Sequence, residues 1–329
     1  MKALVTGGGG FLGRFIVRQL LARGDDVAIF SRGDYPELRK IGVRLISGDL
    51  GEPEPVRSAC AGIHTVFHAA ANTGMWGPWE AFNGPNVRGT QHVLDACLAR
   101  GVDKLVYTSS PSVVFANASQ ENCDESLPYP ASYESHYAKS KAMGEKLVLE
   151  ANGNRLLTCS LRPHLVFGPG DPHLLVAVLA RARTGRFIQV GDGKNKVDFS
   201  YVEDAARAHI LAADALGHGS AVAGSAYFIS QDEPVALYPW LRALFARLDI
   251  PPLKRRCSLR SARAIGAVLE CVHRTFPRLG EPRITRFLAS ELALSHYYDI
   301  SRAKNDFGYR PLFTMEQALE KTLPYLADL

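Results

Sequence analysis

Short apolar runs alternate with longer amphipathic stretches through the first half of the chain. The runs predict buried strands, and the longer stretches, with apolar residues three and four positions apart, predict helices such as 90–99 and 132–150. Strands separated by helices of this length form βαβ crossovers. The pattern therefore predicts a doubly wound α/β fold around a parallel sheet. The predicted strands are 3–5, 27–30, 43–46, 65–67, 104–107 and 156–161.

The pattern changes after Pro163. A loop at 168–172 precedes a helix at 173–183, and strands at 198–202 and 226–229 enclose a helix at 203–215. The last 95 or so residues predict mainly helices, interrupted by prolines. We expect a main domain of residues 1–170 and 196–230. Residues 171–195 and 231–329 should form a smaller, mainly helical lobe on the carboxyl edge of the sheet.

A glycine-rich loop lies between the first strand and the first helix. It reads Thr6-Gly7-Gly8-Gly9-Gly10-Phe11-Leu12-Gly13, which is Gly-x-x-Gly-x-x-Gly counted on its outer and middle glycines. Glycines allow a tight turn and close backbone approach, and the following helix offers free N–H groups to a pyrophosphate. The loop therefore predicts a dinucleotide site. The contacting residues should be Gly7, Gly10, Phe11, Leu12 and Gly13.

The end of the second strand indicates which dinucleotide binds. An acidic residue is expected there when the ribose carries a free 2′-hydroxyl. This chain has Ser31 and Arg32 instead, and a hydroxyl with a guanidinium suits a 2′-phosphate. NADP is therefore the predicted cofactor and NAD the weaker candidate. The alternative is that Arg32 is a solvated arginine at a strand end.

Tyr137 and Lys141 lie four residues apart in a predicted helix, so both side chains belong to one helix face. A fixed ammonium favours the phenolate and lowers the pKa of a tyrosine from about 10. Tyr137 would then exchange a proton near neutral pH. Taken alone, a tyrosine and a lysine four residues apart are equally often two surface side chains without a catalytic role.

Ser109 and Ser110 follow the fifth strand, at the carboxyl edge where doubly wound sheets bind ligands. A hydroxyl there can hydrogen-bond a substrate carbonyl while negative charge develops on its oxygen. A turn or helix-capping role for the segment 108–110 is the alternative.

These segments resemble the extended short-chain dehydrogenase/reductases, a family with a Rossmann fold. The matching segments, about two-thirds of the chain in the family's order, are 6–13, 48–50, 68–70, 86–90, 107–110, 137–141, 161–163 and 201–206. The resemblance implies that Ser110, Tyr137 and Lys141 are catalytic, with Tyr137 and Lys141 also contacting the cofactor. It further implies cofactor contacts at Asp49, Leu50, His68, Ala69, Ala70, Pro163 and Val166.

Within that family the chain resembles the 3β-hydroxysteroid dehydrogenase branch, and most of all the 2-alkyl-3-oxoalkanoate reductases of bacterial long-chain olefin biosynthesis. The segments that carry this likeness are 32–38, 191–195, 226–230, 295–299 and 307–311. The resemblance implies NADPH-dependent reduction of a long-chain 2-alkyl-3-oxoalkanoic acid to the 3-hydroxy acid. Three alternatives stay open: a 3β-hydroxysteroid or sterol dehydrogenase, a sugar-nucleotide epimerase, and a non-catalytic NADP sensor.

The charge of the chain is concentrated in one window. The net charge is +5, but residues 251–290 carry +7 and the remainder −2, which argues against general nucleic-acid binding. Ile265, Val268, Leu269 and Val272 form an apolar stripe on a helix in this window. The stripe predicts a helix packed on the core, a lid over an apolar small-molecule substrate, or peripheral membrane contact through 254–286.

Other features are ordinary for a cytoplasmic enzyme. The six cysteines show no metal-ligand spacing with histidines or with one another, so we expect reduced thiols and no metal. No signal peptide and no long apolar span are visible in the sequence, so we expect a cytoplasmic protein, with membrane association as the open alternative. The family resemblance leaves a homodimer open, and the sequence itself does not give the oligomeric state.

Overall fold

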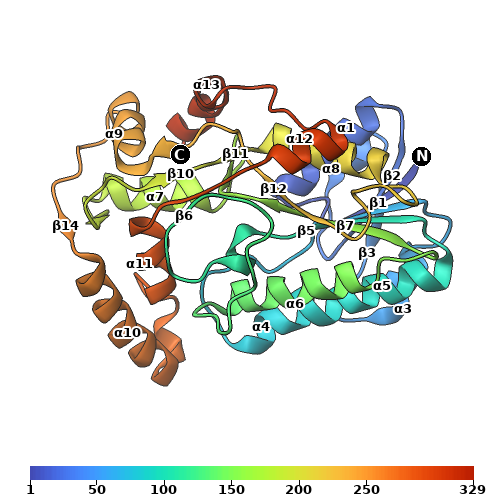
Figure 1. Ribbon diagram of the computed structural model, residues 1–329, viewed down its shortest axis with the longest axis horizontal. Helices are drawn as coiled ribbons and strands as arrows, with labels where there is room; N and C mark the ends of the chain where they lie inside the picture. Colours follow the sequence, from blue (N-terminus) through green and yellow to red (C-terminus); the bar gives the residue numbers. More distant parts are fainter.

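A seven-stranded parallel sheet organises the computed structural model, which describes residues 1–329 (Figure 1). The strand order is β3-β2-β1-β4-β5-β7-β12, so the order reverses between β1 and β4. The doubly wound fold class is confirmed, and ligands bind beside such a reversal. The strands are β1 (Lys2–Thr6), β2 (Asp26–Ser31), β3 (Arg44–Ser47), β4 (Thr65–His68), β5 (Lys104–Thr108), β7 (Leu157–Pro163) and β12 (Ala226–Ile229).

Helices cover both faces of this sheet (Figure 1). One face packs in a buried apolar cluster with α1 (Phe11–Ala22), α8 (Val202–Ala215) and α12 (Ser301–Phe307). The other packs with α3 (Pro53–Ala59), α5 (Gly89–Arg100) and α6 (His136–Glu150). Shorter elements are α2 (Pro36–Lys40), α4 (Trp79–Asn83), the π-helix η1 (Gly84–Arg88) and the 3-10 helix η2 (Pro111–Val114).

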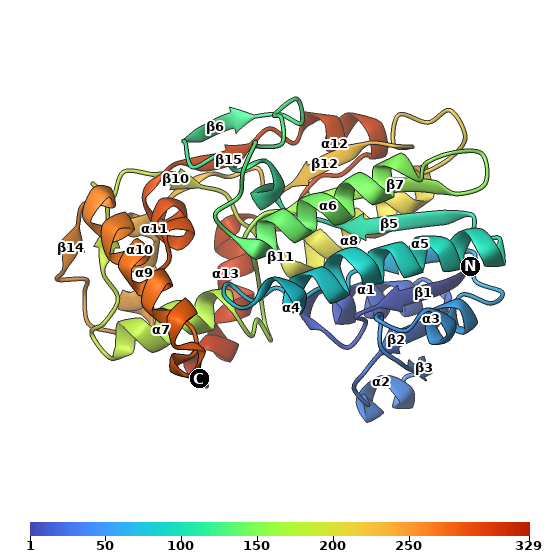
Figure 2. The same cartoon turned by 90° about the horizontal axis from the view of Figure 1, so that it is seen from below.

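A smaller lobe stands at the carboxyl end of the sheet, with its own core of 19 buried apolar residues (Figure 2). A four-stranded sheet of order β13-β10-β15-β6 lies beside it. The strands of this sheet are β6 (Gln120–Cys123), β10 (Lys196–Val197), β13 (Val235–Ala236) and β15 (His296–Tyr298). Two further pairs of short strands are β8 (Val166–Phe167) with β11 (Ser200–Tyr201), and β9 (Gln189–Val190) with β14 (Arg256–Cys257). The helices are α7 (Leu174–Arg183), α9 (Leu237–Arg247), α10 (Leu259–Thr275), the 3-10 helix η3 (Pro277–Leu279), α11 (Arg286–Ala293) and α13 (Met315–Ala327).

The predicted domain boundaries stay a prediction, although the chain after β15 returns from the lobe to the sheet. Ile300, Phe307 and Tyr309 are buried in the same apolar cluster as β1 and α1. The strand predicted at 198–202 is shorter than expected, because α8 already begins at Val202. None of the helices has the length and apolarity needed to cross a membrane.

Candidate active site at the carboxyl edge of the sheet

The glycine loop after β1 forms a cradle that excludes side chains. Gly7 has a left-handed φ of 69°, and a Cβ there would lie 2.8 Å from the Cα of Ala70. A Cβ on Gly13 would lie 2.2 Å from the carbonyl oxygen of Gly7. Both distances are far below van der Waals contact, so β1, the loop and the segment after β4 come together only with glycine at these positions.

The start of α1 offers unpaired hydrogen-bond donors inside this cradle. Gly10 is the N-cap residue and provides no side-chain cap. The N–H of Gly10 donates to the carbonyl of Gly7 (2.8 Å), whereas no backbone acceptor meets the N–H groups of Phe11 and Leu12. Free N–H groups at a helix N-terminus bind anions. The loop therefore fits the pyrophosphate of a dinucleotide.

Arg32 is free to meet a ligand beyond the end of β2. Its side chain is 82% exposed, and its nearest acidic partner is Asp49 at 3.7 Å. The Ser31 hydroxyl accepts from the Gly33 N–H at 3.2 Å and lies 3.4 Å from the hydroxyl of Tyr35. The Tyr35 ring stands over Gly9, where an added Cβ would lie 2.0 Å from it. The sequence did not single out Tyr35, although this residue lies in the segment 32–38 that carries the likeness to the reductases.

The remaining residues expected at the cofactor differ in what they expose. His68 is fully buried, and its ring nitrogens lie 2.7 Å from Thr6 Oγ1 and 3.0 Å from Thr90 Oγ1. Burial lowers the pKa of His68 to about 3, so the neutral ring braces β4 against β1 and α5. Only the backbone of the next residues, Ala69 and Ala70, reaches the glycine loop.

Three further predicted contacts lie at the ends of core elements. Leu50 is buried between α3 and α5, and its carbonyl oxygen lies 2.7 Å from His92 Nδ1. Pro163 ends β7, at the same edge of the sheet as the glycine loop, and Val166 begins β8. The roles of these residues at a cofactor stay predictions.

Ser110 and Tyr137 meet at the carboxyl end of β5. Ser110 caps η2, where its Oγ accepts from the N–H (3.3 Å) and hydroxyl (3.0 Å) of Ser112. Tyr137 lies in the first turn of α6. Burial raises the pKa of Tyr137, and a hydrogen bond with the Ser110 side chain lowers it in part. The structure thus brings these two hydroxyls together, while their catalytic roles stay predictions.

Lys141 is buried one turn further along α6. Its ammonium donates to the carbonyl oxygen of Thr108 and stands 4.0 Å from the centre of the Tyr107 ring. Burial lowers the pKa of Lys141 to about 7, against an opposing effect of Glu145. The expectation that Lys141 lowers the pKa of Tyr137 is wrong for this structure, because burial dominates and the pKa of Tyr137 is raised.

A buried ion pair supports α6 behind Lys141. Arg162 in β7 and Glu145 in α6 are both almost fully buried, with 2.7 Å between guanidinium and carboxylate. Tyr129 and Ser160 each donate a further hydrogen bond of 2.8 Å to the Glu145 carboxylate. These contacts hold the helix that carries Tyr137 and Lys141 against the sheet. Periodicity gave no signal for the pair.

Asn86 ties the same helix to the loop after β4. Its amide nitrogen donates to Ser140 Oγ (2.9 Å) and to the Asn72 carbonyl (3.0 Å), and its amide oxygen accepts from the Asn72 N–H (2.7 Å). Asn86 is 1% exposed, so these bonds are shielded from water. They fix α6 relative to the segment that closes over the glycine loop.

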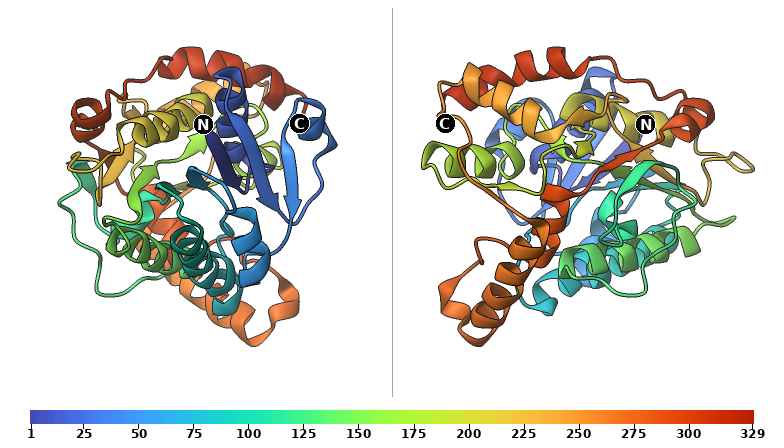
Figure 3. Two further views of the ribbon diagram at one scale, coloured as in Figure 1. Left: turned by 90° about the vertical axis from the view of Figure 1, so that its right-hand side faces the viewer. Right: turned by 60° about the vertical axis from the view of Figure 1, so that its left-hand side comes forward.

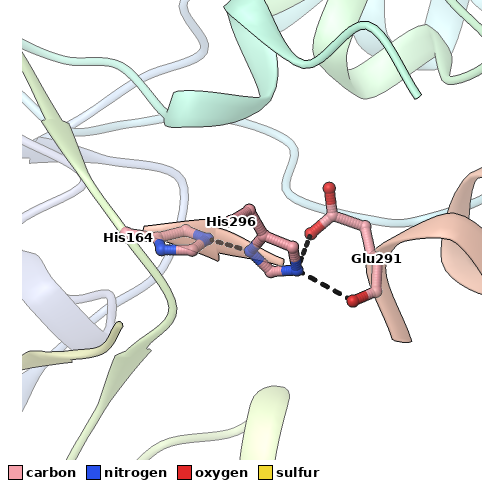
Figure 4. Close-up of side chains that lie close together, drawn as sticks. All are labelled: His164, Glu291 and His296. Carbon is pink, nitrogen blue, oxygen red and sulfur yellow. Dashed lines mark hydrogen bonds and ion pairs between the residues drawn. The ribbon is translucent and has the colours of Figure 1, made fainter. Parts of the chain in front are cut away.

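A buried histidine chain follows Pro163 (Figure 4). His296 Nε2 lies 2.8 Å from the backbone carbonyl of Glu291, which only accepts, so Nε2 carries the proton and Nδ1 accepts. His164 Nε2, 3.0 Å away, therefore donates to Nδ1, and its other ring nitrogen meets the Asp198 carboxylate. Because the two nitrogens of His296 face opposite partners, His164, His296 and Glu291 form a hydrogen-bonded chain rather than a cage for one ion.

A cavity of about 690 Å³ opens between the two parts of the molecule. Ser135 and His136, the two residues before Tyr137 in the chain, form part of its wall. Apolar residues line it from the loop after β4, from α4 and from α11, and α10 adds polar groups. Its lining includes Met75, Trp76, Phe82, His273, Arg274 and Phe287.

Comparison with known proteins decides the family. The profile of the 3-beta hydroxysteroid dehydrogenase/isomerase family matches residues 4–260. The chain belongs to this family. It is therefore an NAD(P)-dependent oxidoreductase of the extended short-chain dehydrogenase/reductase type, as the motifs predicted.

Relatives with curated names divide into two substrate classes. The chain is 45% identical to the 2-alkyl-3-oxoalkanoate reductase of Shewanella oneidensis, over 97% of this chain and 84% of the relative. It is 44% identical to the reductase of the same name from Stenotrophomonas maltophilia, over 98% of each. The mouse sterol-4-alpha-carboxylate 3-dehydrogenase, decarboxylating, is 36% identical over 98% of this chain and 90% of the relative.

Solved structures support the same fold. MoeE5, in complex with UDP-glucose and NAD, has a TM-score of 0.77 at 26% identity and covers 100% of this chain and 99% of its own. The UDP-glucose 4-epimerase of Thermus thermophilus, in complex with NAD, has a TM-score of 0.76 at 26% identity, covering 99% and 98%. The sheet and its flanking helices therefore belong to a dinucleotide-binding architecture.

Proposed function

We propose that this protein uses NADPH to reduce the 3-oxo group of a long-chain 2-alkyl-3-oxoalkanoic acid to the 3-hydroxy acid. The observation that carries the reaction type is the meeting of the Ser110 and Tyr137 hydroxyls at the carboxyl edge of β5. The choice of substrate is supported by the 44–45% identity to two reductases of that name.

The residues of the chain then have separate roles. Bound NADPH supplies a hydride to the carbonyl carbon, which leaves negative charge on the oxygen. Tyr137 delivers its phenolic proton to that oxygen, so the ketone gains one hydride and one proton. Ser110 donates a hydrogen bond to the same oxygen and stabilises the developing charge. Lys141 binds the nicotinamide ribose, and its contact with the Thr108 carbonyl holds its ammonium at the carboxyl end of β5.

The preference for NADPH is assigned to Arg32. Its guanidinium is exposed, and the 3.7 Å ion pair with Asp49 is loose enough for a phosphate to compete. Ser31 adds a hydroxyl at the same strand end.

The raised pKa of Tyr137 suits a proton donor, because the phenol stays protonated at neutral pH until charge develops on the substrate.

The cavity whose wall includes Ser135 and His136, the two residues before Tyr137 in the chain, suits a long apolar molecule with a polar head. Met75 and Trp76 line it from the loop after β4, Phe82 from α4, and Phe287 from α11. Its volume of about 690 Å³ lies within the range of small-molecule sites. Alkyl chains would occupy this space, while the oxo acid faces Ser110 and Tyr137.

A parallel substrate trial tests this proposal. Purified protein is mixed with NADPH or NADH and with either a 2-alkyl-3-oxo acid or a 3-ketosteroid, and the loss of reduced-cofactor absorbance is followed. We expect oxidation of NADPH by the oxo acid at the highest kcat/KM of the four combinations. Turnover of the ketosteroid alone would overturn the substrate assignment, and turnover with NADH alone would overturn the assignment of Arg32.

The second candidate is a 3β-hydroxysteroid or sterol dehydrogenase. The observation in its favour is the 36% identity to the mouse sterol dehydrogenase along nearly the whole chain. The same three side chains would serve oxidation of an alcohol, with Tyr137 accepting the proton. The trial above separates the two candidates, because they differ in the ketone that is accepted.

A further inference from the structure

Helix α10 carries an apolar face that points to solvent. Five of the eleven exposed large apolar side chains of the chain lie within residues 265–279. They are Ile265, Val268, Val272, Phe276 and Leu279, with exposed fractions from 38% to 63%. We call these five residues the 265–279 face. Such a concentration of exposed apolar side chains marks an interaction surface.

The opposite side of α10 is fixed to the protein, so the face cannot turn inward. Gly266 packs against the backbone of Thr285, and a Cβ there would lie 2.8 Å from it. Arg263 donates two hydrogen bonds to Glu134 (2.8 and 3.0 Å), and Glu270 pairs with Arg286 at 2.9 Å. Of the roles expected for the stripe, packing of these exposed side chains on the core therefore does not fit the structure. The role of α10 as a lid stays a prediction.

Exposed basic side chains without ion-pair partners lie on both sides of the face in the sequence, in and before the first turn of α10 and from η3 onward. Six of them make no ion pair within the protein: Lys254, Arg255, Arg256, Arg260, Arg278 and Arg283. They account for most of the +7 charge of residues 251–290. A second copy of this chain would bring like charges against them. An anionic lipid surface offers both the apolar layer for the face and the negative charge for its border.

The face is also continuous with the entrance of the substrate cavity. His273, Arg274 and Pro277 line the cavity from the end of α10 and the start of η3. Phe276 and Leu279 of the face alternate with these residues along the chain. Figure 3 shows α10, the orange helix, projecting from the body of the molecule. A surface that binds α10 and η3 would therefore lie beside the opening of the cavity.

We propose that α10 and η3 dock this protein on an anionic lipid bilayer, with the 265–279 face in the interfacial layer. Docking places the opening of the cavity at the membrane surface. An amphiphile with long alkyl chains can then enter from the bilayer without crossing water. This proposal does not depend on which ketone the site reduces.

Vesicle sedimentation tests the docking directly. The wild-type chain is mixed with vesicles of phosphatidylcholine alone, or of phosphatidylcholine with phosphatidylglycerol, at low and high salt. We expect binding only to the vesicles with phosphatidylglycerol, weakened by salt because the attraction is screened. The double variant Val268→Asp/Val272→Asp should bind about tenfold or more weakly, because charge replaces buried apolar area. Arg255→Gln/Arg256→Gln/Arg278→Gln should weaken binding roughly a hundredfold.

Controls separate docking from misfolding. Ile41→Asp replaces an exposed apolar side chain by a single aspartate at a 50% exposed position of the main domain and should leave vesicle binding unchanged. All variants should bind NADPH like the wild type, because none touches the glycine loop. In addition, a polarity-sensitive fluorophore on Cys271, the exposed cysteine on α10, should shift to shorter wavelength on vesicles with phosphatidylglycerol.

Three results would overturn the proposal. The first is equal sedimentation with and without phosphatidylglycerol, or none at all. The second is unchanged binding of the Val268→Asp/Val272→Asp variant that still binds NADPH. The third is a wild-type dimer in solution that becomes a monomer in this variant, since the face would then be an interface between two copies.

Discussion

Tyr137 is the residue on which the proposed chemistry depends. Replacing it by phenylalanine removes the proton donor and keeps the ring. We expect Tyr137→Phe to lower kcat about 10²–10⁴-fold, the usual range for general acid catalysis, with little change in NADPH affinity. The measurement is the rate of NADPH oxidation with a saturating 3-oxo acid.

Tyr133→Phe is the matched control for this experiment. Tyr133 lies in the segment before α6 and donates its hydroxyl proton to the Val113 carbonyl at 2.9 Å. Its loss should cost stability but not the proton-transfer step. If Tyr137→Phe kept most of its turnover, or if both variants lost equal activity, Tyr137 would not be the donor.

Lys141 makes stability depend on pH in the cofactor-free protein. Its pKa is about 7 in the folded chain against 10.5 as an ordinary lysine, so between these values the unfolded chain holds a proton that the folded chain does not. The free energy of unfolding therefore rises with pH across this window. Lys141→Met should show a smaller rise, measured by urea denaturation at two pH values within it. The control is Lys139→Met, at an exposed position of the same helix, which should behave like the wild type. An unchanged rise in Lys141→Met would contradict the assignment of the pH dependence to Lys141.

Arg32 should control cofactor choice. Arg32→Ala removes the guanidinium assigned to the 2′-phosphate, so we expect KM for NADPH to rise about tenfold, as for the loss of one charge-assisted hydrogen bond of roughly 1.5 kcal/mol. KM for NADH should stay the same. Arg39→Ala, at an exposed arginine paired with Asp34, is the control. An equal effect on both cofactors would contradict the role of Arg32.

At this scale the sequence predicts which residues gather, and fails on their electrostatics. Ser110 and Tyr137 were found because strand ends and helical spacing place them. The raised pKa of Tyr137 was not foreseen, because burial depends on the whole fold. Lys141 was expected to act on the phenol, but its ammonium donates to the carbonyl of Thr108.

Among the elements, α6 depends on the buried pair of Glu145 and Arg162. Removing the carboxylate charge leaves a buried guanidinium without a counter-charge. We expect Glu145→Gln to lower the free energy of unfolding by about 3–5 kcal/mol. Glu150→Gln, at an exposed position of the same helix, should change it little. Chemical denaturation of both variants checks this, and equal stabilities would show that the pair does not hold α6 to the sheet.

The main sheet was predictable as a set of elements, and the sheet beside the lobe was not. The strands of the main sheet are apolar runs because helices cover both of their faces. In contrast, β6 and β15 are short and mostly polar, and they pair across the sequence with Gln120 opposite His296. No local pattern marks such a pairing. The π-helix at Gly84–Arg88, which positions Asn86, was hidden for the same reason.

For the whole molecule, the sequence predicted a lobe beside a dinucleotide domain but left the role of α10 open. Packing, a lid and membrane contact all predict the same apolar stripe, because periodicity does not say what the stripe faces. In the structure, Gly266 and Arg263 fix the other side of the helix to the protein, so the stripe faces solvent. The face is left to solvent, next to the cavity opening.

Isotope transfer from labelled cofactor tests the central claim most directly. NADPH carrying deuterium at the transferred position of the nicotinamide is incubated with the protein and a 2-alkyl-3-oxo acid, and the product is analysed by mass spectrometry. The account predicts that the wild type forms a 3-hydroxy acid with one deuterium on carbon 3. Tyr137→Phe should form the same product at a rate about 10²–10⁴-fold lower. A product without deuterium, or no reduced product from the wild type, would contradict it.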